Sequence, residues 1–406
     1  MDFDDTPEEA AYRAEARTWL EQHAKLRGDD TRQRGGMSDA YSEEEARHVK
    51  EAKEWQATLA DHGWAGITWP EEYGGRGGTV LQQRVFLQEQ AEYDVPAGVF
   101  AQGIGMAGPT IIAHGTEAQK ERFLRPMLRG DEVWCQLFSE PGAGSDLAGL
   151  QTRAVRDGDE FVVNGQKVWT SSAHYSDWGI LLARTDPDAP KHRGITYFLL
   201  DMRTPGIEIR PIKQITGTAH FNEVFLTDVR IPAENVVGDV NGGWACTITT
   251  LTNERTLIAG GGGDTFGELL RFARRFGRTD DPVVRQELAA TYIRIEVLKY
   301  LGWRSQTALS QGRAPGPESS VAKLGYSAHL EALGDLGVAI AGPYGTLMPT
   351  DDDELQAWNQ QLLNQWSSRI GGGTDQVQRN IIGERVLGLP GDVRVDKDVA
   401  FNQLPK

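Results

Sequence analysis

The stretch DGDEFVVNG, residues 157–165, places a short run of β-favouring side chains between two turn dipeptides. Asp-Gly and Asn-Gly readily adopt the positive φ angles of tight hairpin turns. Phe161-Val162-Val163 between them is typical of a strand. Further strands are expected at Ile180–Ala183, Ile195–Leu200 and Glu223–Val229. These signals predict a compact all-β domain, a barrel or sandwich, over residues 131–241.

The sequence before this domain is expected to be helical. Thr6-Pro7-Glu8-Glu9 and Ser42-Glu43-Glu44-Glu45 each place a hydroxyl three residues before a glutamate, the pattern of a helix capping box. Gly63 is expected to end the second of these helices, because glycine adopts the left-handed cap conformation without strain. Two further helices are expected at Gln82–Tyr93 and Glu117–Leu128. We therefore predict a helical domain over residues 1–130.

Helical periodicity returns after Gly242-Gly243. The expected helices cover Trp244–Ala259, Phe266–Phe276, Pro282–Leu309 and Ser319–Ile340. They predict a C-terminal four-helix bundle with an extended tail over residues 242–406. Helices, then strands, then helices favour an α+β fold over a doubly wound parallel sheet. A nicotinamide-binding fold is not indicated, because no GxGxxG motif follows an expected strand.

Composition narrows the function classes. The chain has 406 residues and a formal net charge of −16, which argues against nucleic acid as the main partner. The acidic start has neither the basic nor the apolar region of a signal peptide, and no stretch is long and apolar enough for a membrane span, so a cytoplasmic location is expected. Cys135 and Cys246 form no metal-binding pattern, which favours a reducing compartment and no metal.

Four separate blocks carry more specific information. They are residues 63–75 (GWAGITWPEEYGG), 137–146 (LFSEPGAGSD), 168–172 (VWTSS) and 371–390 (GGGTDQVQRNIIGERVLGLP). Together they resemble the acyl-CoA dehydrogenase family over nearly the full length of the chain. The resemblance implies a three-domain fold, FAD as cofactor and an acyl-CoA substrate.

The second block is the most specific of the four. Its glycines allow close approach of a ligand to the backbone, and its hydroxyls can donate hydrogen bonds. The resemblance implies that Phe138 and Ser139 meet the flavin ring and that Gly144 lies close to the flavin. It also implies that Ser145 binds the FAD pyrophosphate or the thioester arm of the substrate. The alternative is an ordinary loop between two domains, which ten residues in family register make the weaker interpretation.

The third and fourth blocks add further cofactor contacts by the same resemblance. Trp169 is expected to pack on the isoalloxazine ring and Ser171 to bond flavin N5, the alternative being a core tryptophan on a strand. Thr374 and Gln376 are expected to contact FAD. Finally, the spacing of Arg275 and Gln286 matches that of family residues that reach the FAD of a neighbouring subunit.

The catalytic base is not where most of the family carries it. That position is Gly372 in this chain. In a minority branch, which includes isovaleryl- and long-chain-type enzymes, the glutamate lies on the helix that opens the C-terminal domain, and Glu254 matches that position. Leu251 and Ile258 lie on its side of the helix and would desolvate it, which raises a carboxyl pKa. The alternative is an ordinary helix glutamate paired with an arginine.

The remaining assignments concern the substrate and the partners. Arg255 matches the arginine that follows the base and is assigned to substrate binding with Ser145, and Gly372 is expected to offer its backbone N–H to the thioester oxygen. The resemblance implies α,β-dehydrogenation, an electron-transferring flavoprotein as electron acceptor and a homotetramer. A branched, long or bulky acyl group, such as a sterol side chain, is the expected substrate. A non-catalytic subunit of a mixed tetramer and a flavin-dependent oxidase are the alternatives.

Overall fold

The computed structural model describes residues 5–27, 42–96, 98–258, 265–310, 316–317, 319–348, 351–391, 393 and 396–404. The chain divides into two compact units. The first unit contains residues 1–253 and 394–406, and the second contains residues 254–393. The division falls within one helix, α6 (Gly243–Ile258), between Asn253 and Glu254.

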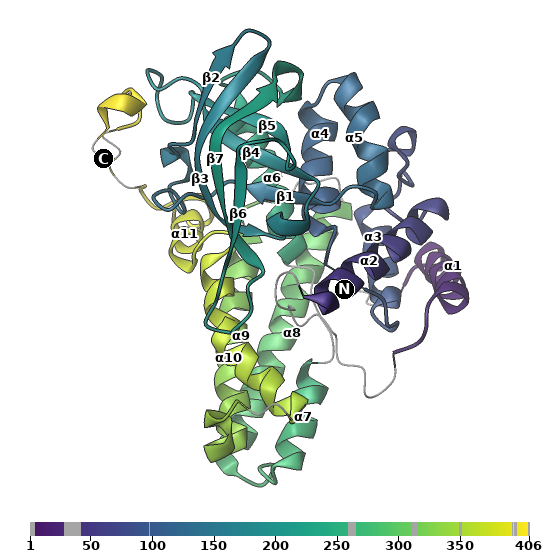
Figure 1. The fold of residues 1–406 in the computed structure, drawn as a ribbon. Helices are drawn as coiled ribbons and strands as arrows, with labels where there is room; N and C mark the ends of the chain where they lie inside the picture. Colours follow the sequence, from purple (N-terminus) through teal and green to yellow (C-terminus); the bar gives the residue numbers. More distant parts are fainter. Residues whose placement is uncertain are drawn as a thin grey trace. The chain divides into compact units, whose positions relative to one another are not determined.

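The N-terminal part of the first unit is helical, as predicted (Figure 1). Its helices are α1 (Pro7–His23), α2 (Glu43–Asp61), α3 (Val80–Gln90), α4 (Gly108–His114) and α5 (Glu117–Arg129). Thr6 caps α1 with a complete capping box. Ser42 caps α2, since its hydroxyl accepts from the Glu45 N–H at 3.1 Å. The expected end of α2 is also confirmed, because Gly63 has a φ of 73° two residues after Asp61.

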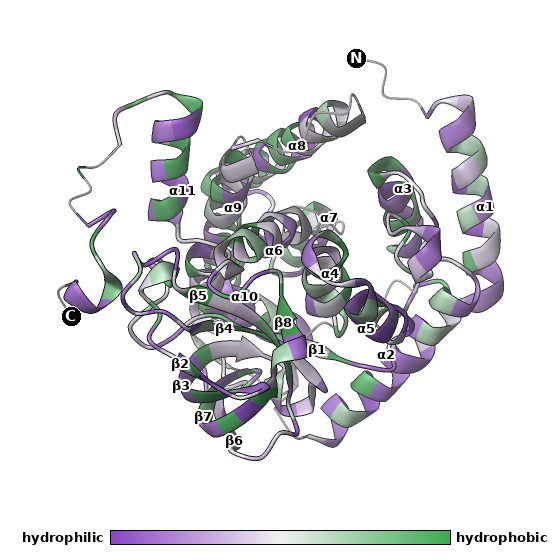
Figure 2. Cartoon of the chain, turned by 90° about the horizontal axis from the view of Figure 1, so that it is seen from above, coloured by the Kyte–Doolittle hydropathy of each residue, from purple (hydrophilic) through white to green (hydrophobic). Residues whose placement is uncertain are grey.

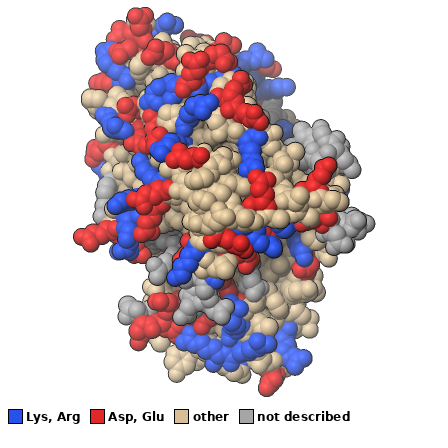
Figure 3. All heavy atoms as spheres, turned by 90° about the vertical axis from the view of Figure 1, so that its right-hand side faces the viewer, with Lys and Arg blue, Asp and Glu red and all other residues tan. Residues whose placement is uncertain are grey.

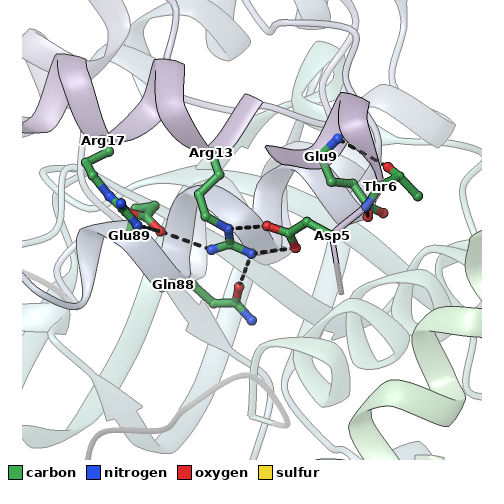
Figure 4. A network of polar contacts seen from close by, with 7 residues as sticks. All are labelled: Asp5, Thr6, Glu9, Arg13, Arg17, Gln88 and Glu89. Atoms are coloured by element: carbon green, nitrogen blue, oxygen red, sulfur yellow. Dashed lines mark hydrogen bonds and ion pairs between the residues drawn. The ribbon is translucent and has the colours of Figure 1, made fainter. Parts of the chain in front are cut away.

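Helix α1 is attached to α3 by a buried carboxylate (Figure 4). Glu89 on α3 accepts from Arg13 Nη1 at 3.0 Å and from Arg17 Nε at 2.8 Å. Burial alone would raise the pKa of Glu89, but the two guanidinium groups lower it below its ordinary value. Tyr12, Ala16 and Leu20 of α1 enter the hydrophobic core of the unit.

The strands form one sheet in the order β6-β7-β3-β2-β4-β5-β8, with β1 paired to β4. Their bounds are β1 (Trp134–Leu137), β2 (Arg153–Asp157), β3 (Glu160–Ser171), β4 (Trp178–Arg184), β5 (Ile195–Asp201), β6 (Ile207–Ile212), β7 (Phe221–Pro232) and β8 (Val236–Val237). Buried and more exposed residues alternate along most of β7, as expected for a strand with one buried face, and its ribbon carries both hydrophobic and hydrophilic segments (Figure 2).

The central strand β4 is buried on both faces. Ile180 and Leu182 join the core that the sheet shares with the N-terminal helices. Leu181 and Ala183 point the other way, into a second core with residues of β3 and β7 such as Val163. Successive side chains of a strand point to opposite faces, so a sheet covered on both sides requires a continuous apolar run, which β4 has.

One of the two predicted turns of residues 157–165 is wrong. Asp157-Gly158 does turn β2 into β3, with Asp157 paired to Glu160. Asn164-Gly165 instead lies inside β3, at a β-bulge opposite β7. A Cβ on Gly165 would lie 2.7 Å from the Cα of Thr152, so the glycine is required by close strand packing. The Asn164 amide is used by Asp228, whose Oδ1 accepts from it at 3.0 Å.

The second unit is helical, as predicted, and α8, α9 and α10 lie side by side in it (Figure 1). The unit begins with the last residues of α6. Its other helices are α7 (Thr265–Arg275), α8 (Pro282–Ser310), α9 (Ser319–Ala341), α10 (Asp353–Ile370) and α11 (Asp375–Ile381). The ends of α6, α7, α8 and α9 fall within two residues of those expected, whereas no helix bounds were predicted for α10 and α11. A core that includes Phe272, Leu336 and Trp358 joins α7, α9 and α10.

Acidic and basic side chains are interspersed over the face shown in Figure 3, so the acidic excess does not form one patch there. Within the described residues, no helix has both the length and the apolar character needed to cross a membrane.

Candidate functional site

The loop after β1 carries the most specific sequence block and is fixed by a buried ion pair. Lys167 on β3 is fully buried, with 0% of its side chain exposed. Its Nζ donates to Glu140 Oε1 at 2.8 Å and to the Phe138 carbonyl at 3.0 Å. Next to it, the Val168 N–H donates to the Ser139 carbonyl at 2.9 Å. Strand β3 therefore holds the backbone of this loop from Phe138 to Glu140.

The Glu140 carboxylate is also bonded on its other side. It accepts from the Gln151 N–H at 2.6 Å and from the Thr152 N–H at 2.9 Å. Burial by itself would raise the pKa of Glu140, but Lys167 and these hydrogen bonds lower it, so the carboxyl is ionised at neutral pH. The sequence analysis missed Glu140 and Lys167 as positioning residues, although Glu140 lies inside the second block and Lys167 directly precedes the third.

The tip of this loop leaves open space beside its glycines. Glu140 and Ala143 exchange both backbone hydrogen bonds at 3.0 Å, which closes a tight turn. Among the described residues, and apart from the chain neighbours, no atom lies within 4 Å of a Cβ built on Gly142 or Gly144, and neither glycine has a positive φ. Neither packing nor backbone conformation within the chain therefore requires glycine there. This open loop, which also carries the exposed Ser145, leaves room for a ligand to approach the backbone closely.

The third block forms a strained bulge at the end of β3. The pairing of β3 with β7 shifts between Lys167 and Thr170, and Trp169 has a φ of 62°. A positive φ is costly for a bulky residue and is kept only where its surroundings enforce it. The Trp169 indole is 57% exposed and meets the edge of Phe221 at 5.8 Å between ring centroids. Trp169 therefore lies outside the core and offers a flat apolar face to a planar ligand.

The two blocks are adjacent in space. The bond from Val168 to Ser139 joins the residue before Trp169 to the loop after β1. Ser139 and Ser171 are half-buried, at the loop and at the end of β3 respectively. The Phe138 ring, by contrast, is buried against Tyr197 and belongs to the hydrophobic core. The predicted flavin contacts of these residues stay predictions.

In the second unit, the fourth block forms a glycine turn before α11. Gly372 and Gly373 have φ values of 63° and 85°. The Gln378 amide donates to both of their carbonyl oxygens, at 3.1 and 3.2 Å. Thr374 caps α11, because its hydroxyl accepts from the Val377 N–H at 3.1 Å. Gln378 is a further positioning residue that the sequence analysis missed.

A buried carboxylate supports the same turn. Asp375 accepts from Arg369 Nε at 3.2 Å, and Lys323 Nζ lies 3.6 Å from its Oδ1. Asp375 and Lys323 are both buried. Gln376, which the resemblance assigns to FAD, is exposed on α11.

Glu254 lies on α6 at the first position of the second unit and is half-buried. The preceding turn of α6 is anchored in the first unit, where Thr250 Oγ1 lies 2.8 Å from Thr110 Oγ1 and 3.1 Å from Tyr197 Oη. Helical spacing of four residues places Glu254 on the face that carries Thr250. The side chains of Arg255 and Ile258 lie outside the described residues.

The two residues expected to reach a neighbouring subunit have different settings. Arg275 donates at 2.9 Å to both Asp352 and Glu354, at the start of α10. The hydrogen bond from Arg275 lowers the pKa of Asp352 to about 2. Gln286 is exposed on α8. Their role toward a second subunit stays a prediction.

Comparison with known proteins gives matches along almost the whole chain. Residues 6–131, 135–229 and 241–387 match the acyl-CoA dehydrogenase N-terminal, middle and C-terminal domains. Acyl-CoA dehydrogenase IpdE1 of Mycobacterium tuberculosis is 40% identical over 389 residues, which cover 94% of this chain and 98% of that protein.

Two solved structures are similar in fold and sequence. The Tcur3481-Tcur3483 steroid ACAD has a TM-score of 0.80 and 31% identity, over 97% of this chain and 100% of that one. The ChsE4-ChsE5 complex from Mycobacterium tuberculosis has a TM-score of 0.78 and 31% identity, over the same shares.

Proposed function

Since the chain belongs to the acyl-CoA dehydrogenase family, we propose that it introduces a C=C bond beside the thioester of a bulky acyl-CoA, with Glu254 as base. The family fixes the broader class, an oxidoreductase that uses FAD. The observation that carries the proposal within this chain is the open glycine loop beside the exposed, strained Trp169.

The cofactor contacts are proposed residue by residue from the family resemblance. Ser139, Gly144 and Ser145 would line it along the loop after β1, and Trp169 and Ser171 would meet the flavin ring. In the second unit, the proposed FAD contacts are Thr374 and Gln376. FAD, when bound, supplies the acceptor for the hydride that leaves the β-carbon of the substrate.

The protein supplies the base and the stabilisation of charge. The α-proton of a thioester becomes removable when hydrogen bonds stabilise the negative charge that develops on the carbonyl oxygen. We assign that role to the backbone N–H of Gly372, whose turn is held by Gln378. The Glu254 carboxylate takes the α-proton, and its half-buried position limits its hydration. Arg255 and Ser145 are proposed to bind the substrate.

The glycine at position 372 favours a bulky substrate. Most of the family has a glutamate there, whereas this chain has the second of three consecutive glycines. Moving the base to Glu254 removes a side chain from that turn and leaves room for a larger acyl group. The similar Tcur3481-Tcur3483 protein is a steroid ACAD, which supports a polycyclic or sterol-derived acyl chain here.

The second unit also offers an apolar surface for subunit contacts. Tyr292, Ile293, Val297 and Tyr300 of α8 recur at helical spacing and are 48–60% exposed. We propose a homotetramer that passes electrons to an electron-transferring flavoprotein. A mixed oligomer is the second candidate, because one similar solved structure is the ChsE4-ChsE5 complex. Light scattering and flavin content of the purified single chain separate the two: one FAD per chain in a tetramer supports the first, and a chain without flavin supports the second.

The reaction is tested by anaerobic mixing of the flavin-loaded protein with a panel of acyl-CoA thioesters. Loss of flavin absorbance with a steroid-like or long branched acyl-CoA, and little with butyryl-CoA, is the expected result. Bleaching confined to short straight chains would contradict the substrate assignment. No bleaching by any thioester would contradict the dehydrogenase assignment. Rapid reoxidation by oxygen would instead favour an oxidase.

A further inference from the structure

The strained end of β3 is connected to helix α2 by a chain of buried polar side chains. Glu45, in the first turn of α2, lies 2.8 Å from His174 Nε2 through either carboxylate oxygen. His174 follows β3, and only 2% of its side chain is exposed. On its other side, His174 Nδ1 lies 3.2 Å from the Asn222 amide nitrogen on β7. Helix, loop and strand thus meet through these three side chains.

The orientation of each group follows from its partners. Asn222 is fully buried, and its amide nitrogen lies 3.0 Å from the Thr170 carbonyl, which can only accept. The amide nitrogen is therefore a donor, and the acceptors for its second hydrogen are His174 Nδ1 at 3.2 Å and, at a longer 3.4 Å, the His220 carbonyl. This leaves the Nε2–H of His174 to donate to Glu45. The donors thus run in one direction, from Asn222 to His174 and from His174 to Glu45.

This series of hydrogen bonds ends at the backbone of the bulge, where two residues have positive φ angles. Trp169 and Ser172, with φ values of 62° each, flank Thr170 and Ser171. Asn222 holds the Thr170 carbonyl between them, and the Ser172 N–H donates to the His220 carbonyl at 3.1 Å. Left-handed backbone at bulky residues persists only where the surroundings determine it.

The segment after the bulge is tied to α2 by packing as well. Tyr175 Oη donates to Ser172 Oγ at 2.6 Å, and Tyr175 packs against a buried apolar cluster that includes Ala52 of α2. Two independent contacts, one polar and one apolar, therefore link α2 to the bulge.

We propose that Glu45, His174 and Asn222 are positioning residues that fix the Trp169–Ser172 bulge for binding of the flavin ring. This inference rests on the proposed function, which places Trp169 and Ser171 at the flavin. These three hydrogen-bonded side chains are called the relay below. Through the relay, helix α2 would control cofactor affinity, although none of its residues is assigned to the cofactor site.

Two substitutions at His174 distinguish its hydrogen bond to Glu45 from its hydrogen bond with Asn222. His174→Asn keeps an acceptor at the position of Nδ1 and loses the donor to Glu45. His174→Gln keeps a donor near the position of Nε2 and loses the acceptor for Asn222. Both remain polar and smaller than histidine, which limits the risk of misfolding. Glu45→Ala removes the end of the relay. Gln56→Leu on the same helix is the matched control, since it removes a buried 2.8 Å bond to the Leu128 carbonyl away from the bulge.

The measurements are FAD affinity of the apoprotein, fluorescence of the bound flavin, and hydrogen exchange of the Ser172 amide. His174→Gln is expected to weaken FAD binding about tenfold, to raise flavin fluorescence because Trp169 quenches it less, and to speed exchange at Ser172. His174→Asn and Glu45→Ala are expected to have smaller effects in the same direction. Gln56→Leu is expected to lower thermal stability with none of these changes.

Trp169→Phe separates failure of this inference from failure of the proposed function. If Trp169→Phe weakens FAD binding while the His174 and Glu45 variants bind FAD like the wild type, the relay has no positioning role and the proposed function stands. If Trp169→Phe also leaves FAD binding and flavin fluorescence unchanged, the assignment of the bulge to the flavin is wrong, and the inference falls with it.

Discussion

The loop after β1 in the first unit and the Gly371–Thr374 turn in the second are both assigned to the cofactor, but they are held differently. In the first, Glu140 accepts three hydrogen bonds and Lys167 donates two, all between 2.6 and 3.0 Å. In the second, Lys323 lies 3.6 Å from Asp375, and among the described residues the Gln378 Oε1 atom has no hydrogen-bond partner.

This difference indicates that the loop and the turn have different roles. A buried network in which both charged groups are hydrogen-bonded favours one arrangement, so we expect the loop after β1 to be set before any ligand binds. The glycine turn depends mainly on one amide, that of Gln378, and on the cap made by Thr374. We therefore expect substitutions in the first network to affect folding and cofactor binding together. Substitutions at the turn are expected to affect catalysis more than folding.

The largest expected effect is at Lys167. Lys167→Met leaves the Glu140 carboxylate buried without its cation, which is expected to cost about 3–5 kcal/mol of unfolding free energy. Urea denaturation measures it. Arg230→Met is the control on the same sheet, because its ion pairs with Asp157 and Glu160 are exposed to solvent and are expected to contribute little to stability. Equal stabilities of the two variants would contradict the distinction between the two regions.

At the glycine turn, Gln378→Leu removes two hydrogen bonds and is expected to cost about 1–3 kcal/mol of unfolding free energy. We expect kcat to fall more than KM changes, because the Gly372 amide loses its alignment with the thioester oxygen. Gln376→Leu on the exposed side of α11 is the control and is expected to weaken FAD binding at unchanged stability. A pure KM effect of Gln378→Leu would count against this role of the turn.

Trp169→Gly tests whether the bulge is strained. Glycine adopts the φ of 62° without cost, and strain at such a position is on the order of 1 kcal/mol. The apoprotein is expected to keep or gain stability by thermal unfolding, while FAD binds at least tenfold more weakly. Loss of stability together with unchanged FAD affinity would show that Trp169 is a structural residue.

The last expected effect is confined to acidic pH and concerns His220. Burial lowers the pKa of His220 from 6.5 to about 4, with a smaller contribution from His174. Between these pH values the unfolded chain binds the proton and the folded chain does not. The stabilising effect is therefore complete above pH 6.5 and is lost as the pH falls toward 4. Melting temperatures across this range should fall less for His220→Gln than for the wild type, and parallel curves would contradict the assignment.

The sequence predicted the classes of the elements well, because periodicity and capping are local signals. The Thr6 capping box and the start of α9 at Ser319 came directly from such patterns. The prediction of a turn at Asn164-Gly165 was wrong for a physical reason. The glycine accommodates Thr152, the residue just before β2, and no local pattern reports that contact. Similarly, helix α4 is short and was not anticipated.

The candidate site was predictable only as far as its motifs reach. Trp169 and Gly144 were named from their blocks, but the strain at one and the open space at the other depend on backbone geometry. Glu140 and Lys167 are 27 residues apart in sequence, and their pairing needs the loop to fold back on β3. Positioning residues such as these contact the backbone of the functional loop from another strand, and a sequence motif does not encode such a contact.

The most direct test of the account is proton removal by Glu254. Flavin-loaded wild type and Glu254→Gln are mixed anaerobically with a bulky acyl-CoA, and flavin absorbance is followed by stopped flow. Glu287→Gln, an exposed helix glutamate of the second unit, is the control. Rapid bleaching of the wild type and the control, with bleaching of Glu254→Gln slowed by at least about a thousandfold, is the predicted result. Bleaching of Glu254→Gln at the wild-type rate, with FAD fully bound, would contradict it.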